Sequence, residues 1–162
     1  FNDRPGFHKS SPKCKWRSEK GEQKAVGRTK GGINTKIHAV VDALGNPIKF
    51  ILSEGQRHDS KFLIPLLREL KINNCNILAD RAYDTDEIIK YINTNNANVV
   101  IPPKSNRKIK RKIDKHIYKE RHLVECLFQK LKWFRRIFVR FEKLDSSFLA
   151  FLYLASSVLW LK

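Results

Sequence analysis

Apolar residues are spaced along the chain first at strand-like intervals and then at helical intervals. The segment TKIHAVVDALGNPIKFIL (35–52) contains two β-rich runs on either side of DALGNP, whose Gly and Pro favour a turn, so it predicts a β-hairpin. In HDSKFLIPLLRELKI (58–72) a phenylalanine and several leucines recur at helical spacing. Asp59 or Ser60 can cap that helix, and Pro65 falls within its first turns, where proline is best tolerated.

The middle of the chain alternates strand and helix patterns. NILAD (76–80) predicts a short buried strand, and NVVIP (98–102) predicts another that its prolines stop. Between them, DTDEIIKYINTN (84–95) predicts a helix with Asp84 and Glu87 at capping-box spacing. A hairpin followed by alternating helices and strands is typical of an α/β domain with a mixed sheet.

The two ends of the chain differ in character. Residues 1–34 are polar and basic with little periodicity, so we expect a loose N-terminal arm there and a folded domain over residues 35–162. Near the other end, FLAFLYLASSVLWL (148–161) is shorter than the roughly 20 residues of a membrane span and predicts a buried core helix. The sequence starts at Phe1 and contains no methionine, from which we expect a fragment or a processed piece.

Charge is the strongest signal in the composition. Among 162 residues, 33 Lys and Arg stand against 16 Asp and Glu, a formal net charge of +17. A surplus of this size favours a polyanionic partner, most commonly nucleic acid. A merely soluble basic surface, ribosomal-type binding or attachment to a membrane surface would also satisfy it. Three cysteines (Cys14, Cys75, Cys126), none at CxxC spacing, argue against a disulfide framework or zinc site and fit a reducing cytoplasm.

YKERHLVECLFQKLKWFRR (118–136) predicts one amphipathic helix. At about 100° per residue, four polar residues fall within one arc about 60° wide, namely Tyr118, Arg121, Glu125 and Lys132. The opposite side carries the apolar residues Leu123, Val124, Leu127, Leu131 and Phe134. The helix is therefore expected to bury one face and to display a tyrosine, two cations and a single acid on the other.

Two interpretations of that single acid stay open. Glu125 can pair with Arg121 or Gln129 on a solvated face. Alternatively it is a metal ligand, because a carboxylate on a cationic face repels DNA unless a metal ion stands between them. Asp80 is then its natural partner, since it ends a buried strand and α/β sites form at the carboxyl ends of strands. A turn or capping role for Asp80 within DRAYD is the other option.

Several motifs together resemble the DDE transposases of bacterial insertion sequences, in the group loosely called IS-five-like. YKERHLVECLFQKLK (118–132) looks like the Y-R-E-K signature of that family, and ILADRAYD (77–84) resembles the segment with its second catalytic Asp. GRTKGGINTKIHAVVDALGNPIKFIL, GQRHDS and VVIPPKSNRK are also similar to it. The resemblance implies a ribonuclease-H-like fold, a mixed sheet flanked by helices, that cleaves and joins DNA phosphodiesters with two divalent ions, Mg²⁺ or Mn²⁺.

The resemblance also implies roles for individual residues. Asp80 would be the second catalytic acid and Glu125 the third, both as metal ligands. Tyr118, Arg121 and Lys132 would position DNA phosphates or support the acids. The partner would be duplex DNA, both transposon ends and target, in a bacterial cytoplasm beside the nucleoid and without a membrane. The oligomeric state stays open, a homodimer on DNA being one option.

The start of the chain departs from the family pattern. The family's first catalytic Asp lies on the first strand, upstream of a His near His8, yet Asp3 has neither the apolar strand nor the expected spacing. Asp42 lies in the hairpin, where turning the chain is its expected role. We therefore expect the first acid and first core strand to be missing. An inactive remnant that only binds DNA, or an unrelated basic RNA-binding module, stays open as an alternative.

The stretch from Pro102 to Lys143 carries much of the positive charge, with fifteen Lys and Arg residues against four acids. Within it, the loop KSNRKIKRK (104–112) is expected to contact DNA phosphates without reading sequence, through Lys104, Arg107 and Lys108. Three aromatic residues interleave with the cations and could stack on unpaired bases, although core packing is favoured for the latter two: Trp133, Phe134 and Phe138.

Two histidines are weighed separately. His58, in GQRHDS, has a structural role and a place at the rim of an active site as equal options. His38, inside KIHAVV, is expected on a sheet face rather than as a ligand.

Overall fold

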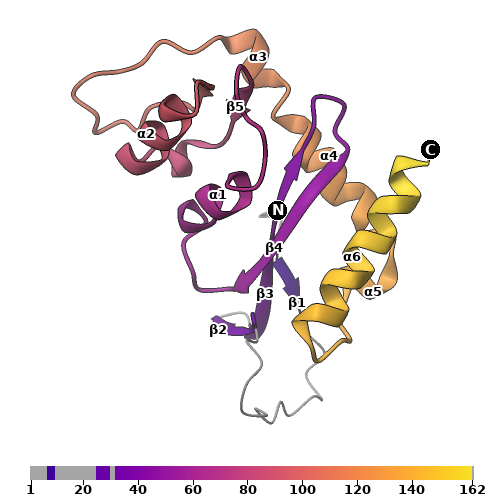
Figure 1. Ribbon diagram of the computed structural model, residues 1–162. Helices are drawn as coiled ribbons and strands as arrows, with labels where there is room; N and C mark the ends of the chain where they lie inside the picture. The colour runs from indigo at the N-terminus through magenta and orange to yellow at the C-terminus, as the bar shows by residue number, and fades with distance from the viewer. Residues whose placement is uncertain (1–6, 10–24, 30–31, 162) are drawn as a thin grey trace. The chain divides into compact units, whose positions relative to one another are not determined.

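The computed structural model describes residues 7–9, 25–29 and 32–161, and the chain forms two compact units (Figure 1). The first unit combines the chain up to Arg57 with the chain from Leu123 onward, and the second spans His58–His122. Each unit has its own secondary structure and its own buried residues, so each is described by itself.

A long central strand organises the sheet of the first unit. This strand, β3 (Gly32–Val41), pairs antiparallel with β1 (Phe7–Lys9), β2 (Gly27–Thr29) and β4 (Pro47–Glu54). The β3–β4 pair is the predicted hairpin, which is confirmed. Strands β1 and β2 lie in the stretch predicted to be a loose arm, so its described parts belong to the sheet instead. The domain boundary after residue 34 stays a prediction, and Asp3 lies outside the described residues.

The hairpin turn depends on one acid and one glycine. The Asp42 Oδ1 atom accepts the backbone N–H groups of Leu44 and Asn46, each at 2.8 Å. Gly45 has φ +84°, in the left-handed region where a side chain is disfavoured. The expected turning role of Asp42 is confirmed, and these hydrogen bonds hold its pKa below its usual value against the opposing effect of burial.

Three helices complete the first unit, namely α4 (His122–Leu131), α5 (Arg135–Phe138) and α6 (Asp145–Trp160). Their apolar residues and the inner face of the β3–β4 hairpin form one core of Ile37, Phe50, Leu127, Phe128, Leu131, Ile137, Phe148, Leu152 and Ala155. The predicted C-terminal helix is thereby confirmed, with one face in the core, whereas Leu154 on another face is 62% exposed. Among the described residues, no helix has the length and apolarity needed to cross a membrane.

The single helix predicted over residues 118–136 is wrong. The backbone forms α3 (Lys115–Lys119), then α4 and α5, with a turn after each of the first two. The Arg121 N–H donates to the Tyr118 carbonyl three residues earlier at 3.1 Å, which tightens the chain between α3 and α4. Periodicity identifies the apolar face but does not fix whether every backbone bond stays helical. The shared arc predicted for Tyr118, Glu125 and Lys132 therefore no longer follows.

The second unit contains a strand, a helix and a parallel strand. Strand β5 (Asn76–Leu78) pairs in parallel with β6 (Asn98–Val100), and helix α2 (Asp86–Thr94) connects them. Both predicted strands and the helix between them are confirmed. The predicted α/β class is confirmed in its coarse form, although the described strands form a four-stranded antiparallel sheet and a two-stranded parallel sheet rather than one mixed sheet.

The two predicted helix caps have different outcomes, because Asp59 lies at an N-cap position whereas Asp84 does not cap α2. In α1 (Ser60–Leu67), Asp59 is the N-cap residue without a side-chain capping bond, and Pro65 lies inside the helix. The capping box at Asp84 is wrong, because α2 begins at Asp86 and the hydroxyl of Thr85 accepts the Ile88 N–H at 3.4 Å. Asp84 cannot cap α2 because its carboxylate is held by groups more distant in sequence.

Candidate functional site

Asp80 leaves the end of β5 with its carboxylate exposed. It lies two residues beyond the strand and precedes a short 3-10 helix, η1 (Arg81–Tyr83). Its backbone carbonyl accepts the Tyr83 N–H at 2.9 Å, whereas its side chain makes no capping bond. The backbone of Asp80 therefore forms the turn. Its side chain is 55% exposed, so the carboxylate is accessible to solvent.

Three of the residues predicted to act together meet at this carboxylate. Arg121 Nη1 lies 3.1 Å from Asp80 Oδ1, and the guanidinium carbon lies 5.9 Å from the centre of the Tyr118 ring. An ion pair this exposed contributes only about 0–1 kcal/mol to stability. The grouping therefore places an acid, a guanidinium and a phenol where a ligand from solvent can reach them.

Tyr83 and Asp59 are further neighbours of Asp80 that the sequence reasoning missed. Burial, followed by the negative charges of Asp59 and Asp80, raises the pKa of the Tyr83 phenol above its ordinary value of 10. Tyr83 therefore stays protonated. The only signal in the sequence was the short spacing between Tyr83 and Asp80, since Asp59 was interpreted as a helix cap.

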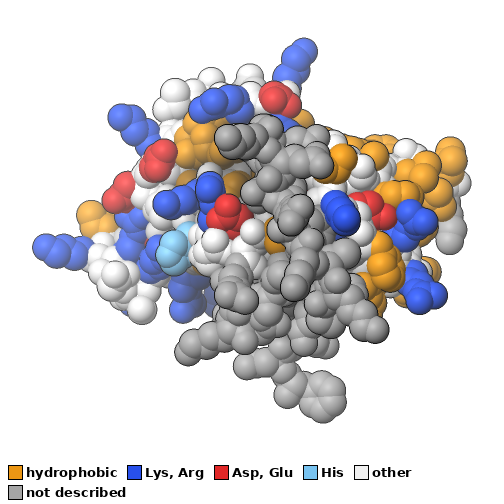
Figure 2. All heavy atoms as spheres, turned by 90° about the horizontal axis from the view of Figure 1, so that it is seen from below, with side chains coloured by type: hydrophobic (Ala, Val, Ile, Leu, Met, Phe, Trp, Pro, Cys, Tyr) orange, Lys and Arg blue, Asp and Glu red, His pale blue; other side chains and the backbone are white. Residues whose placement is uncertain are grey.

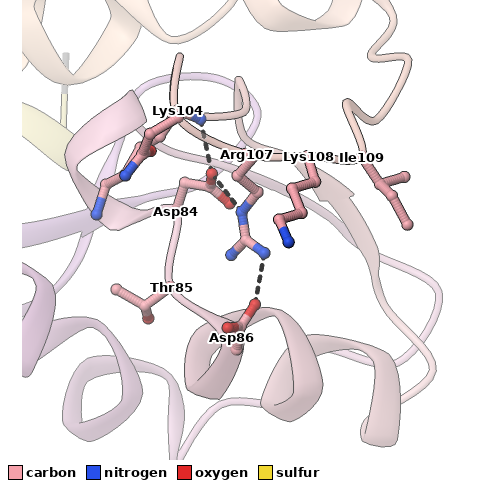
Figure 3. A pocket seen from close by; sticks show the side chains of 8 residues that line it. Asp84, Thr85, Asp86, Lys104, Arg107, Lys108 and Ile109 are labelled. Atoms are coloured by element: carbon pink, nitrogen blue, oxygen red, sulfur yellow. Dashed lines mark hydrogen bonds and ion pairs between the residues drawn. The ribbon is translucent and has the colours of Figure 1, made fainter.

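A second acid in the same segment is buried and fully engaged. Asp84 is 2% exposed, and its Oδ2 accepts the Lys104 N–H at 2.7 Å and Arg107 Nε at 2.8 Å. Its Oδ1 accepts Arg111 Nη2 at 2.5 Å. Arg107 also donates to Asp86 at 2.5 Å (Figure 3). Burial opposes ionisation, but these bonds outweigh it and lower the Asp84 pKa from 3.8 to about 2.

The bonds around Asp84 shape an open cleft of about 560 Å³ (Figure 3). Its lining contains three residues predicted to contact DNA together with two acids, and consists of Asp84, Thr85, Asp86, Lys104, Asn106, Arg107, Lys108 and Ile109. The three predicted cations are therefore brought together, but Arg107 already binds two carboxylates. Its direct contact with phosphate stays a prediction.

Glu125 belongs to the first unit, on α4, where its side chain is half-buried. Asp80 belongs to the second unit, so the pairing of the two carboxylates stays a prediction. Over the described ranges, no group of three or more His, Cys, Asp and Glu side chains is arranged to hold a metal ion. The carboxylate oxygens of Asp80 and Glu125 are nevertheless the donor type that Mg²⁺ and Mn²⁺ prefer, so their chemistry fits such an ion.

The remaining candidates lie partly at the surface. Lys132 is exposed just beyond the end of α4, and Trp133 is 78% exposed. Phe134 packs against the core as predicted, whereas Phe138 is 53% exposed and its predicted core role is wrong. Phe138 ends the short helix α5, which turns Ile137 inward in its place. Figure 2 shows lysine and arginine side chains projecting from the surface with acids and hydrophobic side chains among them.

Within the part of the chain that the structure describes, the histidines and cysteines form no ligand set for a metal ion. His38 is buried on β3 and its Nε2 lies 2.8 Å from the Ser53 hydroxyl, which agrees with the predicted sheet-face position. His58 is exposed just before α1, so both of its options stay open. Cys75 and Cys126 are free thiols, and Cys14 lies outside the described residues.

Comparison with known proteins gives two matches. A family model described as "Transposase DDE domain" matches residues 6–160. The chain is also 40% identical over 131 residues to a Brucella ovis protein named "Putative transposase for insertion sequence element IS6501". That alignment covers 80% of this chain and 100% of the relative. No solved structure matches the chain.

Proposed function

We propose, from the premise that this chain belongs to the family of transposase DDE domains, that it cleaves and joins DNA strands for an insertion sequence. The substrate would be duplex DNA, at the transposon ends and at the target. The net charge of +17 supports a polyanionic partner of this kind. A homodimer on DNA, and a location beside the bacterial nucleoid, are further parts of this proposal.

The observation that carries the proposal is the contact between two sequence motifs. Asp80 comes from ILADRAYD and Arg121 from YKERHLVECLFQKLK, and their side chains lie 3.1 Å apart with the Tyr118 ring beside them. Chance surface pairs are common, but this pair joins the two segments by which the chain resembles DDE transposases. It therefore supports a shared site at the end of β5.

We assign the metal-binding role to Asp80 and Glu125. A bound Mg²⁺ or Mn²⁺ would supply polarisation of the phosphodiester and activation of the attacking hydroxyl. Arg121 suits bidentate contact with a phosphate, because its planar guanidinium presents paired donors while it already neutralises Asp80. Tyr118 would hold that guanidinium from the side, and Lys132 would add a point charge.

We also infer a ribonuclease-H-like fold for the catalytic domain. An antiparallel set of strands (β1, β3 and β4) precedes a parallel pair joined by a helix (β5, α2 and β6), and this order supports the inference. In such a fold, β1 would correspond to the first strand.

The test is strand cleavage and joining on duplex DNA that carries the ends of the matching insertion sequence, with and without Mg²⁺ or Mn²⁺. We expect Asp80→Asn and Glu125→Gln to abolish the reaction while DNA binding persists. Glu120→Gln is the matched control, since Glu120 is an exposed acid within YKERHLVECLFQKLK with no assigned role.

Three other results would be informative. Salt-sensitive DNA binding without cleavage by the unaltered chain would favour the inactive remnant. Equal activity in Glu120→Gln and Glu125→Gln would remove Glu125 from the site. A DNA affinity that does not change between low and physiological salt would contradict DNA binding altogether.

A further inference from the structure

The basic loop, residues 104–112, divides its cations into two sets. It contains six Lys and Arg residues within nine positions and forms no helix or strand. Arg107 and Arg111 are half-buried and turn toward Asp84, whereas Lys108, Lys110 and Lys112 are exposed. One set of cations therefore faces the body of the second unit and the other faces solvent.

The inward set depends on a single carboxylate. Asp84 binds the loop at three separated points, at the Lys104 N–H and at the side chains of Arg107 and Arg111. The loop's own backbone adds a turn, in which the Arg107 N–H donates to the Lys104 carbonyl at 3.1 Å. Because a run of like charges repels itself, a loop of this composition is expected to be extended and mobile unless an acid organises it.

We propose that Asp84 is a positioning residue for DNA binding, which folds the basic loop so that Lys108, Lys110 and Lys112 form a preformed strip for backbone phosphates. This inference rests on the proposed function, because it takes duplex DNA as the partner. A strip that is ordered before binding loses less conformational entropy when DNA arrives than a disordered basic segment does. Asp84 would thus strengthen DNA binding although its own charge repels DNA.

The effect of Asp84 on DNA affinity distinguishes a positioning role from a simple effect of net charge. If only net charge matters, Asp84→Asn adds one positive charge to the surface and tightens DNA binding. If Asp84 positions the loop, the same substitution weakens binding, by about tenfold for three lysines that must then be ordered on DNA. The two accounts predict opposite signs for one measurement.

A matched pair of variants tests the same point without touching the buried acid. Arg111→Gln and Lys112→Gln each remove one positive charge from neighbouring positions, but only Arg111 contacts Asp84. Charge alone predicts equal losses of DNA affinity, whereas positioning predicts the larger loss for Arg111→Gln. This pair still tests the positioning role if Asp84→Asn fails to fold. In Arg111→Gln, the Lys104 N–H and the Arg107 side chain can still bind Asp84.

The experiment combines affinity for a duplex DNA of fixed length, measured from 50 to 200 mM salt, with amide hydrogen exchange of the basic loop in the free protein. We expect faster loop exchange and weaker binding in Asp84→Asn and Arg111→Gln. Lys108→Gln/Lys110→Gln should leave loop exchange unchanged and reduce the magnitude of the salt slope by about 2. Asp86→Asn should not weaken binding, since Asp86 is 90% exposed and its ion pair with Arg107 adds to the one that Arg107 already makes with the buried Asp84.

The inference is overturned if Asp84→Asn binds DNA as tightly as the unaltered chain or more tightly, or if its loop exchanges no faster. Failure of the proposed function looks different, because the unaltered chain would then show no salt-sensitive DNA binding at all. If the unaltered chain binds DNA and Arg111→Gln matches Lys112→Gln in both measurements, the positioning role alone is refuted.

Discussion

Arg140 is a buried cation that links separate elements of the first unit. Replacing it tests how much its buried ion pair contributes to the stability of that unit. The Arg140 side chain is 1% exposed, and its Nη2 lies 2.5 Å from Asp145 Oδ1 while Nη1 donates to the Thr35 hydroxyl at 2.7 Å. Arg140 also donates to two carbonyls, those of Glu142 at 3.0 Å and Lys143 at 3.4 Å. The guanidinium thus joins strand β3 to the start of helix α6.

The expected cost of Arg140→Met follows from these contacts. Breaking a buried ion pair by removing one partner typically costs about 3–5 kcal/mol, because the other charge stays buried without compensation. Asp145 is that other charge, and it also accepts the Ala25 N–H. We therefore expect Arg140→Met to lower the free energy of unfolding by about 3–5 kcal/mol. Combining it with Asp145→Asn should cost about 1–3 kcal/mol less than the sum of the two single changes.

Urea unfolding followed by tryptophan fluorescence measures this cost. Trp160 reports on the correct unit, since its Nε1 donates to the Pro47 carbonyl at 2.9 Å across the same fold. Arg135→Met is the matched control, because Arg135 is an exposed arginine in helix α5 of the same unit and its replacement should change the free energy of unfolding by no more than about 0.5 kcal/mol. A loss for Arg140→Met no larger than that of Arg135→Met would refute the reasoning.

Three further predictions concern individual positions. Because the Asp84 pKa lies near 2 when folded and 3.8 otherwise, its ionisation should stabilise the second unit by about 2 kcal/mol above pH 4. This contribution to the free energy of unfolding should disappear as the pH falls from 4 to 2. In urea unfolding, Asp84→Asn should lack the pH dependence that the ionisation of Asp84 causes. Thr85→Ala should destabilise helix α2 by about 1 kcal/mol through loss of its cap, seen as faster hydrogen exchange in the helix, while exchange in α6 stays unchanged. Gly45→Ala should cost about 1–2 kcal/mol in the fluorescence assay because φ is +84°, and Gly45→Asn should cost less, since asparagine tolerates that region.

The sequence by itself determined the local elements and the partners that local spacing can specify. The alternation around DALGNP specified the β3–β4 hairpin, and the acceptor oxygens of Asp42 specified its turn. The apolar period of residues 123–134 identified Leu127 and Leu131 on the buried face of α4, although it missed the buried Phe128. Family motifs pointed to Asp80 and Arg121 together, and the structure brings these two side chains to 3.1 Å.

Only the tertiary structure decided the use of the charged residues. Spacing made Asp84 a helix cap, yet its partner Arg111 is 27 positions away, and that attraction outweighs a local capping bond. Arg140 belongs to the basic stretch from Pro102 to Lys143, yet contacts with Thr35 and Asp145 bury it. Propensity and periodicity describe near neighbours along the chain. A buried charge, in contrast, is stabilised by whichever distant group the fold brings within hydrogen-bonding distance, so its position could not be read from the pattern.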